Sequence, residues 1–501
     1  MSATLKDERP PRLAMGMYKR FLLGALIVVL ASAATVATAA LLEVKDDVSI
    51  FTRAQKHPLA GLQNALDGVD SGGPQTILIL GSDRRFADIK AKIPARSDTM
   101  ILLRLDPSKG ATAVMSLPRD LKVRIPGHGI DKINAAYAIG GPQLTVRTVR
   151  ALLHIPINHV VNVNFGGFRR AVDRLGCVFT DVDRRYFNDN NPPYGGGGNY
   201  ATIDVKAGYQ KLCGQEALDY VRYRHFDSDL VRAARQQQFL SDAKDQIGVG
   251  KVFSNRKALL RIFGAYTQTD IGSNSAILRL LKLAVESAQN PVQEVRFPGQ
   301  ITGDFVTVTP ESLARVKEEF MNARGTKGPR GQAGKEKATG AARKRSRGSR
   351  RASPLAPGLI DARRPAEDLA VQLKTKLTFP VYYPRALLAG ASYLPDHSRT
   401  YDIFDRGRHR YRAYRMVVKT NEIGQYYGIQ GTTWSGPPIL DNPSERRRMG
   451  GRSYELFFDG DRLRVVSWRS GKAVYWISNT LLQTLTNRQM LGLARSIGKV
   501  S

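Results

Sequence analysis

The sequence predicts an α/β fold, with a three-layer α/β/α domain built on a mixed sheet. Short apolar runs rich in β-branched residues alternate with stretches of helical spacing. This alternation is typical of a sheet covered by helices on both faces. The expected strands are 76–80, 99–105, 111–116 and 160–164, and the expected helices are 142–153, 168–175, 214–223, 230–247 and 311–320.

The length of 501 residues allows two globular domains with additional tails. Changes in composition along the chain mark the expected boundaries. The expected segments are a basic tail at 1–20, a transmembrane anchor at 21–42, a stalk at 43–74, the α/β domain at 75–322, a basic linker at 323–364 and a small α+β domain at 365–501.

The run at 21–42 carries no charge and follows Lys19 and Arg20. It has about the ~20 residues that a helix needs to cross a bilayer. The basic residues before it predict a cytoplasmic N-terminus, a single-pass protein of the cell membrane, and extracytoplasmic globular domains. The small residues at 37–40 would also suit signal-peptide cleavage, but the run exceeds the ~7 to 15 residues typical of that signal. We therefore expect an uncleaved signal anchor.

The formal net charge of +32 predicts an anionic partner: nucleic acid, a membrane surface or a phosphate-bearing polymer. A location outside the membrane argues against nucleic acid. Residues 323–358 are basic and nearly free of large apolar side chains, so we expect a disordered tether there. Binding to an anionic wall polymer or to lipid headgroups is the alternative role for that segment.

Two cysteines, Cys177 and Cys213, lie downstream of the expected anchor. In an oxidising compartment they are expected to form one structural disulfide. Neither has the spacing of a metal site or of a redox pair, so a catalytic thiol is not expected.

The C-terminal segment has the pattern of strands followed by a closing helix, which predicts an α+β domain. Its three tryptophans, Trp434, Trp468 and Trp476, are expected in the core or on a sheet face, with a sugar-binding surface as the alternative. The expected strands are 411–419, 426–430, 454–459, 463–468 and 472–477, and the helix is 487–497.

Two carboxylates flank the first two expected strands. Asp83 follows Gly81 and Ser82 at the end of one strand, and Asp98 directly precedes the next. Carboxylates at the ends of strands can hold Mg²⁺ beside a phosphate, although each aspartate could simply cap a turn.

Arg119 comes just past the third expected strand, where its planar guanidinium could bind two phosphate oxygens. A surface ion pair with Asp120 is the simpler interpretation. Residues 220–238, which we call the arginine segment, hold further cations. Their arginines would form a pocket that an anion must neutralise, unless they are only a solvated basic face. Arg222 and Arg224 share a face if extended, and Arg232, Arg235 and Gln236 have helical spacing.

Over residues 75–249, and more weakly to 319, the chain resembles the LytR-CpsA-Psr family. Several independent blocks occur in the family's order. The matching blocks are Gly81-Ser82-Asp83, Arg96-Ser97-Asp98-Thr99, Ser116-Leu117-Pro118-Arg119-Asp120, the stretch 125–137, and the arginine segment ending in Arg235-Gln236-Gln237.

The resemblance implies a membrane-tethered phosphotransferase of cell wall biogenesis. Such an enzyme moves a phosphoglycan from a polyprenyl-pyrophosphate carrier to a peptidoglycan hydroxyl, and an apolar pocket receives the polyprenyl tail. Asp83 and Asp98 would hold Mg²⁺ or Mn²⁺, and Asp229 would be a base or an arginine-orienting carboxylate. The pyrophosphate would be bound by Arg119, Lys132, Arg222, Arg224, Arg232, Arg235 and Gln236, of which Arg119, Arg222 and Arg224 would also be catalytic.

Two alternatives stay open at this point. The same pocket could serve a polyprenyl-pyrophosphate phosphatase, with water as the acceptor. The second alternative is a non-catalytic protein, either a regulator of the cell envelope or a wall-binding protein. The anchor argues against direct DNA binding, and the presence of the motif's carboxylates and arginines argues against an inactive scaffold.

Overall fold

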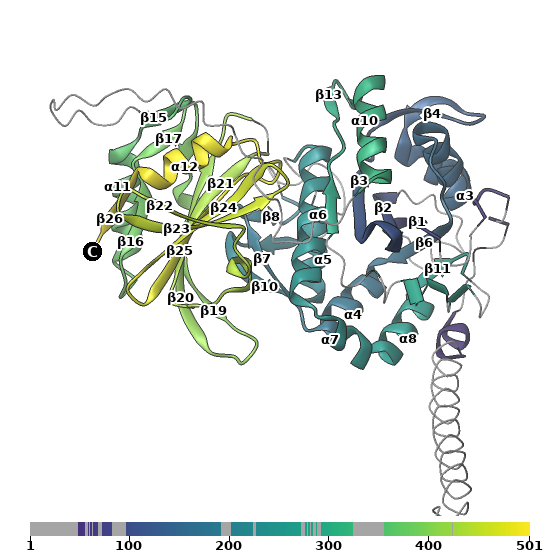
Figure 1. Cartoon of the computed structure of the whole chain (residues 1–501), viewed down its shortest axis with the longest axis horizontal. Coiled ribbons are helices and arrows are strands. Elements are labelled where there is room, and N and C mark those ends of the chain that lie inside the picture. The colour runs from purple at the N-terminus through teal and green to yellow at the C-terminus, as the bar shows by residue number, and fades with distance from the viewer. Residues whose placement is uncertain are drawn as a thin grey trace, which may run out of the picture.

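The computed structural model describes two domains that lie side by side (Figure 1). Among the residues it describes, no helix is long and apolar enough to cross a bilayer. The expected anchor at 21–42 and most of the expected linker lie outside them. The described residues are 49–55, 59, 61, 62, 64–68, 73–82, 97–191, 202–223, 227–271, 276, 277, 279, 280, 282, 283, 287, 292–323, 355–422 and 424–501.

A six-stranded sheet with the order β11-β6-β1-β2-β3-β12 forms the centre of the first domain. The central strands β1, β2 and β3 are antiparallel neighbours, whereas β6 and β12 run parallel to β1 and β3. The predicted α/β class with a mixed sheet is therefore confirmed. The strands are β1 Gln75–Ser82, β2 Ser97–Asp106, β3 Ala111–Leu117, β6 His159–Asn164, β11 Thr267–Thr269 and β12 Val292–Val295.

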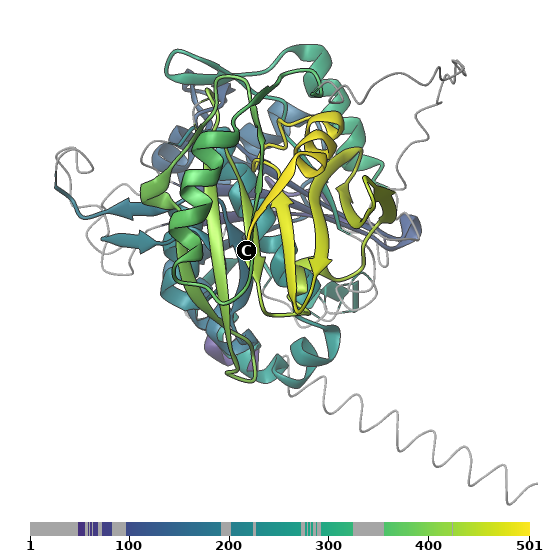
Figure 2. The same cartoon turned by 90° about the vertical axis from the view of Figure 1, so that its left-hand side faces the viewer.

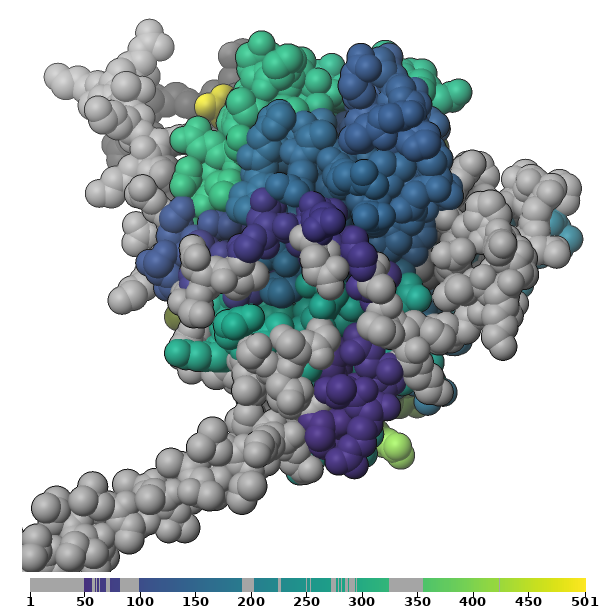
Figure 3. All heavy atoms as spheres, turned by 90° about the vertical axis from the view of Figure 1, so that its right-hand side faces the viewer, coloured from purple at the N-terminus to yellow at the C-terminus, as the bar shows by residue number. Residues whose placement is uncertain are grey.

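Both faces of this sheet are apolar, which explains why its strands read as continuous apolar runs. On one face, Leu78 and Leu102 pack in a core with residues of α3 (Ile133–Leu153) and α10 (Pro310–Met321). On the other face, Ile77 belongs to a second cluster that includes Phe51. Figure 3 shows that the described N-terminal residues, in purple, lie on the side of the molecule away from the C-terminal domain.

Helix α3 begins earlier than predicted. The sequence pattern indicated a helix from residue 142, but the structure has a helical segment from Ile133 as well. Gly140 and Gly141 depart from helical geometry, with φ of 59° at Gly141, and Pro142 follows them. A proline inside a helix lacks a donor and clashes with the preceding turn, so the chain kinks here and the sequence signal is interrupted.

A smaller subdomain joins the sheet to the C-terminal domain. Its strands β7 and β10 pair antiparallel, and the predicted disulfide between Cys177 and Cys213 closes the end of this ladder, with an S–S distance of 2.05 Å. The remaining elements of the first domain are β4 Lys122–Ile125, β5 Gly129–Lys132, α4 Phe165–Leu175, β7 Val178–Val182, β8 Tyr186–Asn188, β9 Ile203–Val205, β10 Gly208–Leu212, α5 Gly214–Arg222, α6 Asp229–Gln246, α7 Val249–Ser254, α8 Arg256–Tyr266, β13 Gln300–Thr302 and β14 Phe305–Thr307.

The C-terminal domain is built on a large antiparallel sheet with the order β18-β20-β21-β25-β24-β23-β22, to which β19 adds on β20. Helices α11 and α12 cover the face of this sheet that points away from the first domain (Figure 2). Its elements are β15 Leu359–Asp361, α11 Arg363–Lys374, β16 Val381–Pro384, β17 Ala386–Leu388, β18 Ser392–Tyr393, β19 Arg399–Phe404, β20 Arg410–Lys419, β21 Tyr426–Thr432, β22 Glu445–Met449, β23 Arg452–Asp459, β24 Arg462–Ser470, β25 Ala473–Ser478, α12 Asn487–Arg495 and β26 Ile497–Val500.

The predicted extent of the basic linker, 323–364, is wrong at its C-terminal end. Residues Leu359–Asp361 form β15, which pairs with β17, and Leu359 is buried in the domain core. A strand of three residues has too few apolar positions to give a periodic signal, so only its tertiary pairing identifies it.

Two of the three tryptophans of this domain are core residues, as expected. Trp468 and Trp476 are 1% and 0% exposed. Trp434 is half-buried and packs its ring edge-on against Phe179 of the first domain, with ring centroids 5.1 Å apart. Trp476 also contacts that domain, because its ring meets the ring of Tyr209 at 5.7 Å. Two of the three tryptophans therefore help to hold the domains together.

Candidate functional site

The start of α6 brings the arginine segment to the edge of the central sheet. Ser228 precedes the helix and its hydroxyl accepts a hydrogen bond from the backbone N–H of Val231, as an N-cap does. Two turns later, Gln236 donates to the hydroxyl of Thr99 at 3.0 Å and to the carbonyl of Val221 at 3.1 Å. The helix is thereby tied to the first residues of β2.

Close packing at this edge requires the glycine of the first motif. A Cβ on Gly81 would lie 2.9 Å from the Cβ of Thr99, its partner on β2. Such an approach is shorter than side chains tolerate, so another residue would force the two strands apart. Gly81 therefore lets Thr99 take the position in which it bonds Gln236.

Asp229 lies at the centre of a charged network. Its carboxylate is 3.8 Å from the Nε of Arg119 and is ion-paired with Arg232. It also accepts the backbone N–H of Asp120 at 3.3 Å, and Asp120 in turn is 3.4 Å from the Nζ of Lys132. The tertiary fold thus brings four of the predicted site residues together.

Counted over the residues that the structure describes, this network carries more positive than negative charge. Three cations, Arg119, Arg232 and Lys132, share two carboxylates, Asp229 and Asp120. An anion such as a phosphate would balance the remaining charge. Arg119 does pair with Asp120, at 3.5 Å, but its second contact with Asp229 makes it more than a surface ion pair.

Arg222 is held in place at the end of α5. Its guanidinium donates to Asp219 at 2.6 and 3.1 Å and lies over the ring of Phe165, at 5.5 Å from the centroid. Its side chain is 18% exposed. A guanidinium fixed on two sides is oriented in advance for a ligand, because less rotational freedom is lost on binding.

Arg235 points into the protein interior. Its side chain is fully buried, is ion-paired with Asp227 and donates to the carbonyl of Tyr223 at 2.5 Å. Its guanidinium also lies 4.6 Å from the ring centroid of Tyr186. In the structure Arg235 organises the arginine segment, and its direct contact with a pyrophosphate stays a prediction.

Arg184 and Asp227 were not identified as site residues from the sequence. Arg184 donates to Asp227 at 2.6 Å, so the Asp227 carboxylate binds two arginines at once. Burial alone would lower the pKa of both guanidinium groups, but the attraction of Asp227, together with smaller contributions from neighbouring groups such as Tyr186, outweighs it and the pKa of each is raised. No spacing pattern links Arg184 to the arginine segment, so only the tertiary structure places it there.

Asp183, the neighbour of Arg184, is also buried. Burial raises the pKa of its carboxyl group to about 6, and nearby Arg184 only partly opposes this effect. The hydroxyl of Tyr186 donates to Asp183 at 2.6 Å. Burial also raises the pKa of Tyr186 well above its usual value, so this phenol remains a neutral donor.

The side chains of the two predicted metal ligands lie outside the described part of the chain. Asp83 lies outside the described residues, as does Arg224, and of Asp98 only the backbone, in β2, is described. In the parts of the chain that are described, one group of potential ligands comes together, Asp173 with Cys177 and Cys213. Those two cysteines form the disulfide, so their sulfurs are not free thiolates.

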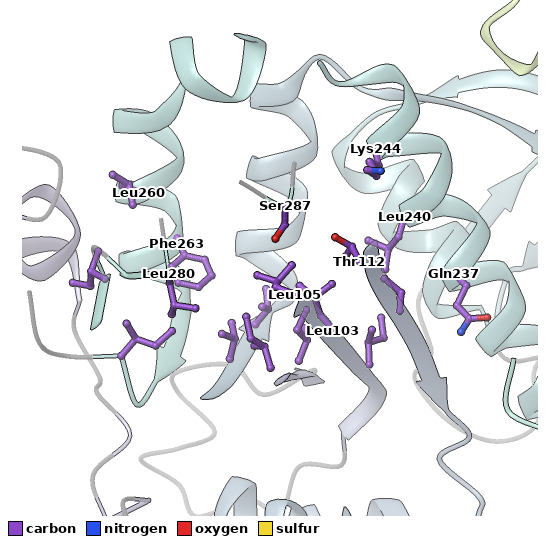
Figure 4. Close-up of a pocket in the computed structure, with 18 of the residues that line it drawn as sticks. Leu103, Leu105, Thr112, Gln237, Leu240, Lys244, Leu260, Phe263, Leu280 and Ser287 are labelled. Atoms are coloured by element: carbon purple, nitrogen blue, oxygen red, sulfur yellow. The ribbon is translucent and has the colours of Figure 1, made fainter. Parts of the chain in front are cut away.

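An apolar pocket of about 580 Å³ lies on the second face of the central sheet. Figure 4 shows Leu103 and Leu105 of β2 between α6 on one side and Leu260 and Phe263 of α8 on the other. The first residue of α6 that lines the pocket is Gln237, which directly follows Gln236, the residue bonded to Thr99. The lining residues are Phe51, Ile77, Ile79, Ile101, Leu103, Leu105, Thr112, Val114, Val161, Val163, Gln237, Leu240, Ser241, Lys244, Leu260, Phe263, Ile271, Ile277, Leu280 and Ser287.

Residues 40–321 match the model of the LytR_cpsA_psr family. A relative from Oceanobacillus iheyensis, the polyisoprenyl-teichoic acid–peptidoglycan teichoic acid transferase TagU, is 33% identical over 256 residues, which are 49% of this chain and 74% of the relative. TagU of Halalkalibacterium halodurans is 32% identical over 262 residues, 51% of this chain and 80% of that protein.

Two further comparisons are with a relative named as a regulatory protein and with a solved structure. Biofilm regulatory protein A of Streptococcus mutans is 27% identical over 283 residues, and this alignment covers 53% of this chain and 68% of that protein. Among solved structures, the LytR-CPS2A-psr family protein YwtF (TagT) with bound octaprenyl pyrophosphate lipid is 26% identical, with a TM-score of 0.39, and covers 53% of this chain and 98% of its own.

Proposed function

Because the chain belongs to the LytR-CpsA-Psr family, whose model covers more than half of it, we propose that it transfers a phosphoglycan from a polyprenyl-pyrophosphate carrier to a peptidoglycan hydroxyl. The reaction attaches a secondary polymer to the cell wall. The names of the related transferases support this reaction class, since they describe the same transfer of a polyisoprenyl-linked polymer to peptidoglycan.

One observation carries the proposal: the apolar pocket and the arginine network share helix α6. Arg232 pairs with Asp229 in the network, and Gln236 bonds Thr99 of β2, while Gln237, Leu240 and Lys244 line the pocket. The donor has the same two parts, an apolar polyprenyl tail joined to a charged pyrophosphate. With its tail in the pocket, its pyrophosphate would lie at the arginines at the start of the helix. The N-terminus of α6 adds a favourable dipole for that negative charge.

The proposed chemical step forms one phosphorus–oxygen bond and breaks another. A peptidoglycan hydroxyl attacks the phosphorus nearest the glycan, the bond to the bridging oxygen breaks, and polyprenyl monophosphate leaves. The hydroxyl proton must pass to a base. Arg119, Arg222 and Arg232 would stabilise the charge that builds on the phosphate oxygens, which is the main contribution a protein makes to phosphoryl transfer.

Asp229 is better suited to orienting these arginines than to removing the proton. Its oxygens are already engaged by Arg119, Arg232 and the N–H of Asp120. A carboxylate that holds two guanidinium groups fixes the geometry of both. We therefore assign Asp229 the orienting role.

We also propose Mg²⁺ as the cofactor, held by Asp83 and Asp98. The register of β1 and β2 supports this pair, because Ser82, which precedes Asp83, lies opposite Ser97, which precedes Asp98. Carboxylate oxygens are the ligands that Mg²⁺ prefers. When bound, the ion would neutralise part of the pyrophosphate charge.

We place the globular domains outside the cell membrane, tethered by the uncharged run at 21–42. That run and the basic residues before it support the orientation. The disulfide between Cys177 and Cys213 also supports an extracytoplasmic location, because disulfides persist in oxidising compartments.

The test is transfer of a labelled glycan from a polyprenyl-pyrophosphate donor to peptidoglycan fragments by the full chain, with and without Mg²⁺. Arg222→Ala should lower kcat at least about 10²-fold. Arg410→Ala is the matched control, because Arg410 is an exposed arginine paired with an aspartate at 2.9 Å in the C-terminal domain. Glycan phosphate released without any acceptor product would indicate a phosphatase, and the absence of turnover would contradict the enzymatic proposal.

A further inference from the structure

We propose that the C-terminal domain is part of the catalytic unit and that Tyr426 is a positioning residue for the arginine segment. The role of that segment in phosphate binding rests on the proposed function. The contacts between Tyr426 and the segment do not depend on it.

Tyr426 completes an aromatic enclosure around Arg184. The Arg184 guanidinium lies 4.4 Å from the ring centroid of Tyr186, 5.3 Å from that of Tyr223 and 5.1 Å from that of Tyr426. The first two rings belong to the first domain, whereas Tyr426 begins β21 of the C-terminal domain and is 8% exposed. One side of the enclosure is therefore supplied by the second domain.

Arg184 transmits this contact to the arginine segment. It donates to Asp227, which also pairs with Arg235, and Asp227 is followed directly by the N-cap of α6, Ser228. Asp229, the residue that orients Arg119 and Arg232, is the first residue of that helix. Displacing Asp227 would thus shift the start of α6 and Asp229 with it.

A second contact from the same domain reaches the helix directly. Gly424, with φ of +73°, lies against the first turn of α6, so that a Cβ there would be 3.2 Å from Val231 and 3.7 Å from the Cα of Asp227. Leu481 packs in an apolar cluster with Val231 and Ala234. Only glycine combines this positive φ with so close an approach.

The domains are also held together away from the site. Arg415 of β20 donates to both oxygens of Asp181 in β7, at 3.0 and 3.2 Å, and the two side chains are 1% and 3% exposed. Arg399 donates to the carbonyl of Ala207 at 2.7 Å. A buried ion pair leaves an uncompensated charge if either partner moves away, so it favours one fixed arrangement of the domains.

The physical role of Tyr426 follows from the burial of this charge cluster. Arg184 and Arg235 hold Asp227 strongly because water is excluded from them. Without the ring of Tyr426, water would reach Arg184, its attraction to the ring would be lost, and Asp227 would be held less firmly. The arginine segment should then sample other positions and present its arginines to the phosphates less often.

The test compares Tyr426→Leu with Tyr426→Phe in the full chain. Leucine removes the ring, whereas phenylalanine keeps the aromatic face over Arg184. We expect Tyr426→Leu to lower kcat about tenfold and to speed amide exchange in residues 229–235, and Tyr426→Phe to restore both. Rescue by phenylalanine would show that the ring over the arginine is what matters.

Tyr382→Leu is the matched control. The ring of Tyr382 packs on Trp468 and Tyr475 inside the C-terminal domain, at 5.9 and 4.6 Å, so its loss should loosen that domain without changing exchange in residues 229–235. Gly424→Ala is a second probe of the proposed contact. It should act in the same direction as Tyr426→Leu, because its methyl group would press on Val231.

The outcomes separate this inference from the proposed function. Unchanged kcat and unchanged exchange in Tyr426→Leu would overturn the positioning role, as would equal losses in the leucine and phenylalanine variants. If the wild-type protein transfers no glycan, the proposed function fails. The exchange comparison between the two variants still decides whether Tyr426 positions the segment.

Discussion

The carboxylate of Asp229 lies 3.8 Å from the guanidinium of Arg119, which joins the start of α6 to the turn after β3. This contact connects two motifs that are far apart in the sequence. It also sets the position of the guanidinium relative to the helix N-terminus, where an anion is favoured. The arginine-orienting role proposed for Asp229 leads to the first prediction.

Asp229→Asn should lower kcat about 10²-fold and also lower the free energy of unfolding, because the amide can still accept the Asp120 N–H but no longer attracts Arg119 or neutralises the buried Arg232. Steady-state transfer kinetics with urea unfolding would check it. Asp402→Asn is the control, since Asp402 pairs with Arg412 at 2.8 Å in the C-terminal domain. Equal kcat in the two variants would refute the orienting role.

Adjacent residues on β2 should respond in opposite ways, because they lie on opposite faces of the sheet. Leu103→Trp would fill the apolar pocket and should weaken binding of octaprenyl pyrophosphate at least about tenfold. Leu102 is 0% exposed in the core on the other face. Leu102→Ala should lower the free energy of unfolding of the protein by ~2–5 kcal/mol without weakening lipid binding. Calorimetric titration and urea unfolding measure both. Unchanged affinity in Leu103→Trp would remove the pocket from the donor site.

Removing the disulfide should destabilise the subdomain that joins the two domains. Cys177 and Cys213 are 36 residues apart, and closing a loop of that length stabilises a fold by ~3–4 kcal/mol in the chain-entropy description. Urea unfolding of the wild type and of the Cys177→Ser/Cys213→Ser double variant would measure the difference. Identical unfolding midpoints would show that the bond contributes nothing to stability.

Asp183 should make stability depend on pH. Burial raises the pKa of this carboxyl to about 6 in the folded protein, above its value in the unfolded chain. The folded state therefore binds the proton more tightly, and the resulting stabilisation, present at low pH, is lost as the pH rises from about 4 through 6. The wild type minus Asp183→Asn difference in free energy of unfolding, measured by urea denaturation, should fall over that range. A flat difference would contradict the raised pKa.

The sequence predicted much of the central sheet because its strands are long and apolar. Helix α6 was predicted at 230–247 and found at Asp229–Gln246, because a helix of this length repeats its pattern over several turns. Shorter elements gave no such signal. Strand β15 has three residues and was assigned to the linker, and the first part of α3 was missed because Gly140, Gly141 and Pro142 interrupt its pattern.

The candidate site also contains features that the sequence predicted and features that it did not. Arg119, Asp229 and Arg232 were identified from their motifs, and the structure brings them into one network. Arg235 was identified too, but its side chain turns inward to Asp227. Spacing along a helix indicates which residues share a face and does not indicate what that face packs against, so the inward direction of Arg235 could not be predicted.

By itself, the sequence determined the α/β class and the pairing of the two cysteines, because each depends on local patterns or on residue types. The tertiary structure alone decided that Arg184 joins Asp227 and that Tyr426 of a separate domain covers Arg184. Such contacts form between segments distant in the chain, where burial and charge pairing select the partners and no local pattern records them.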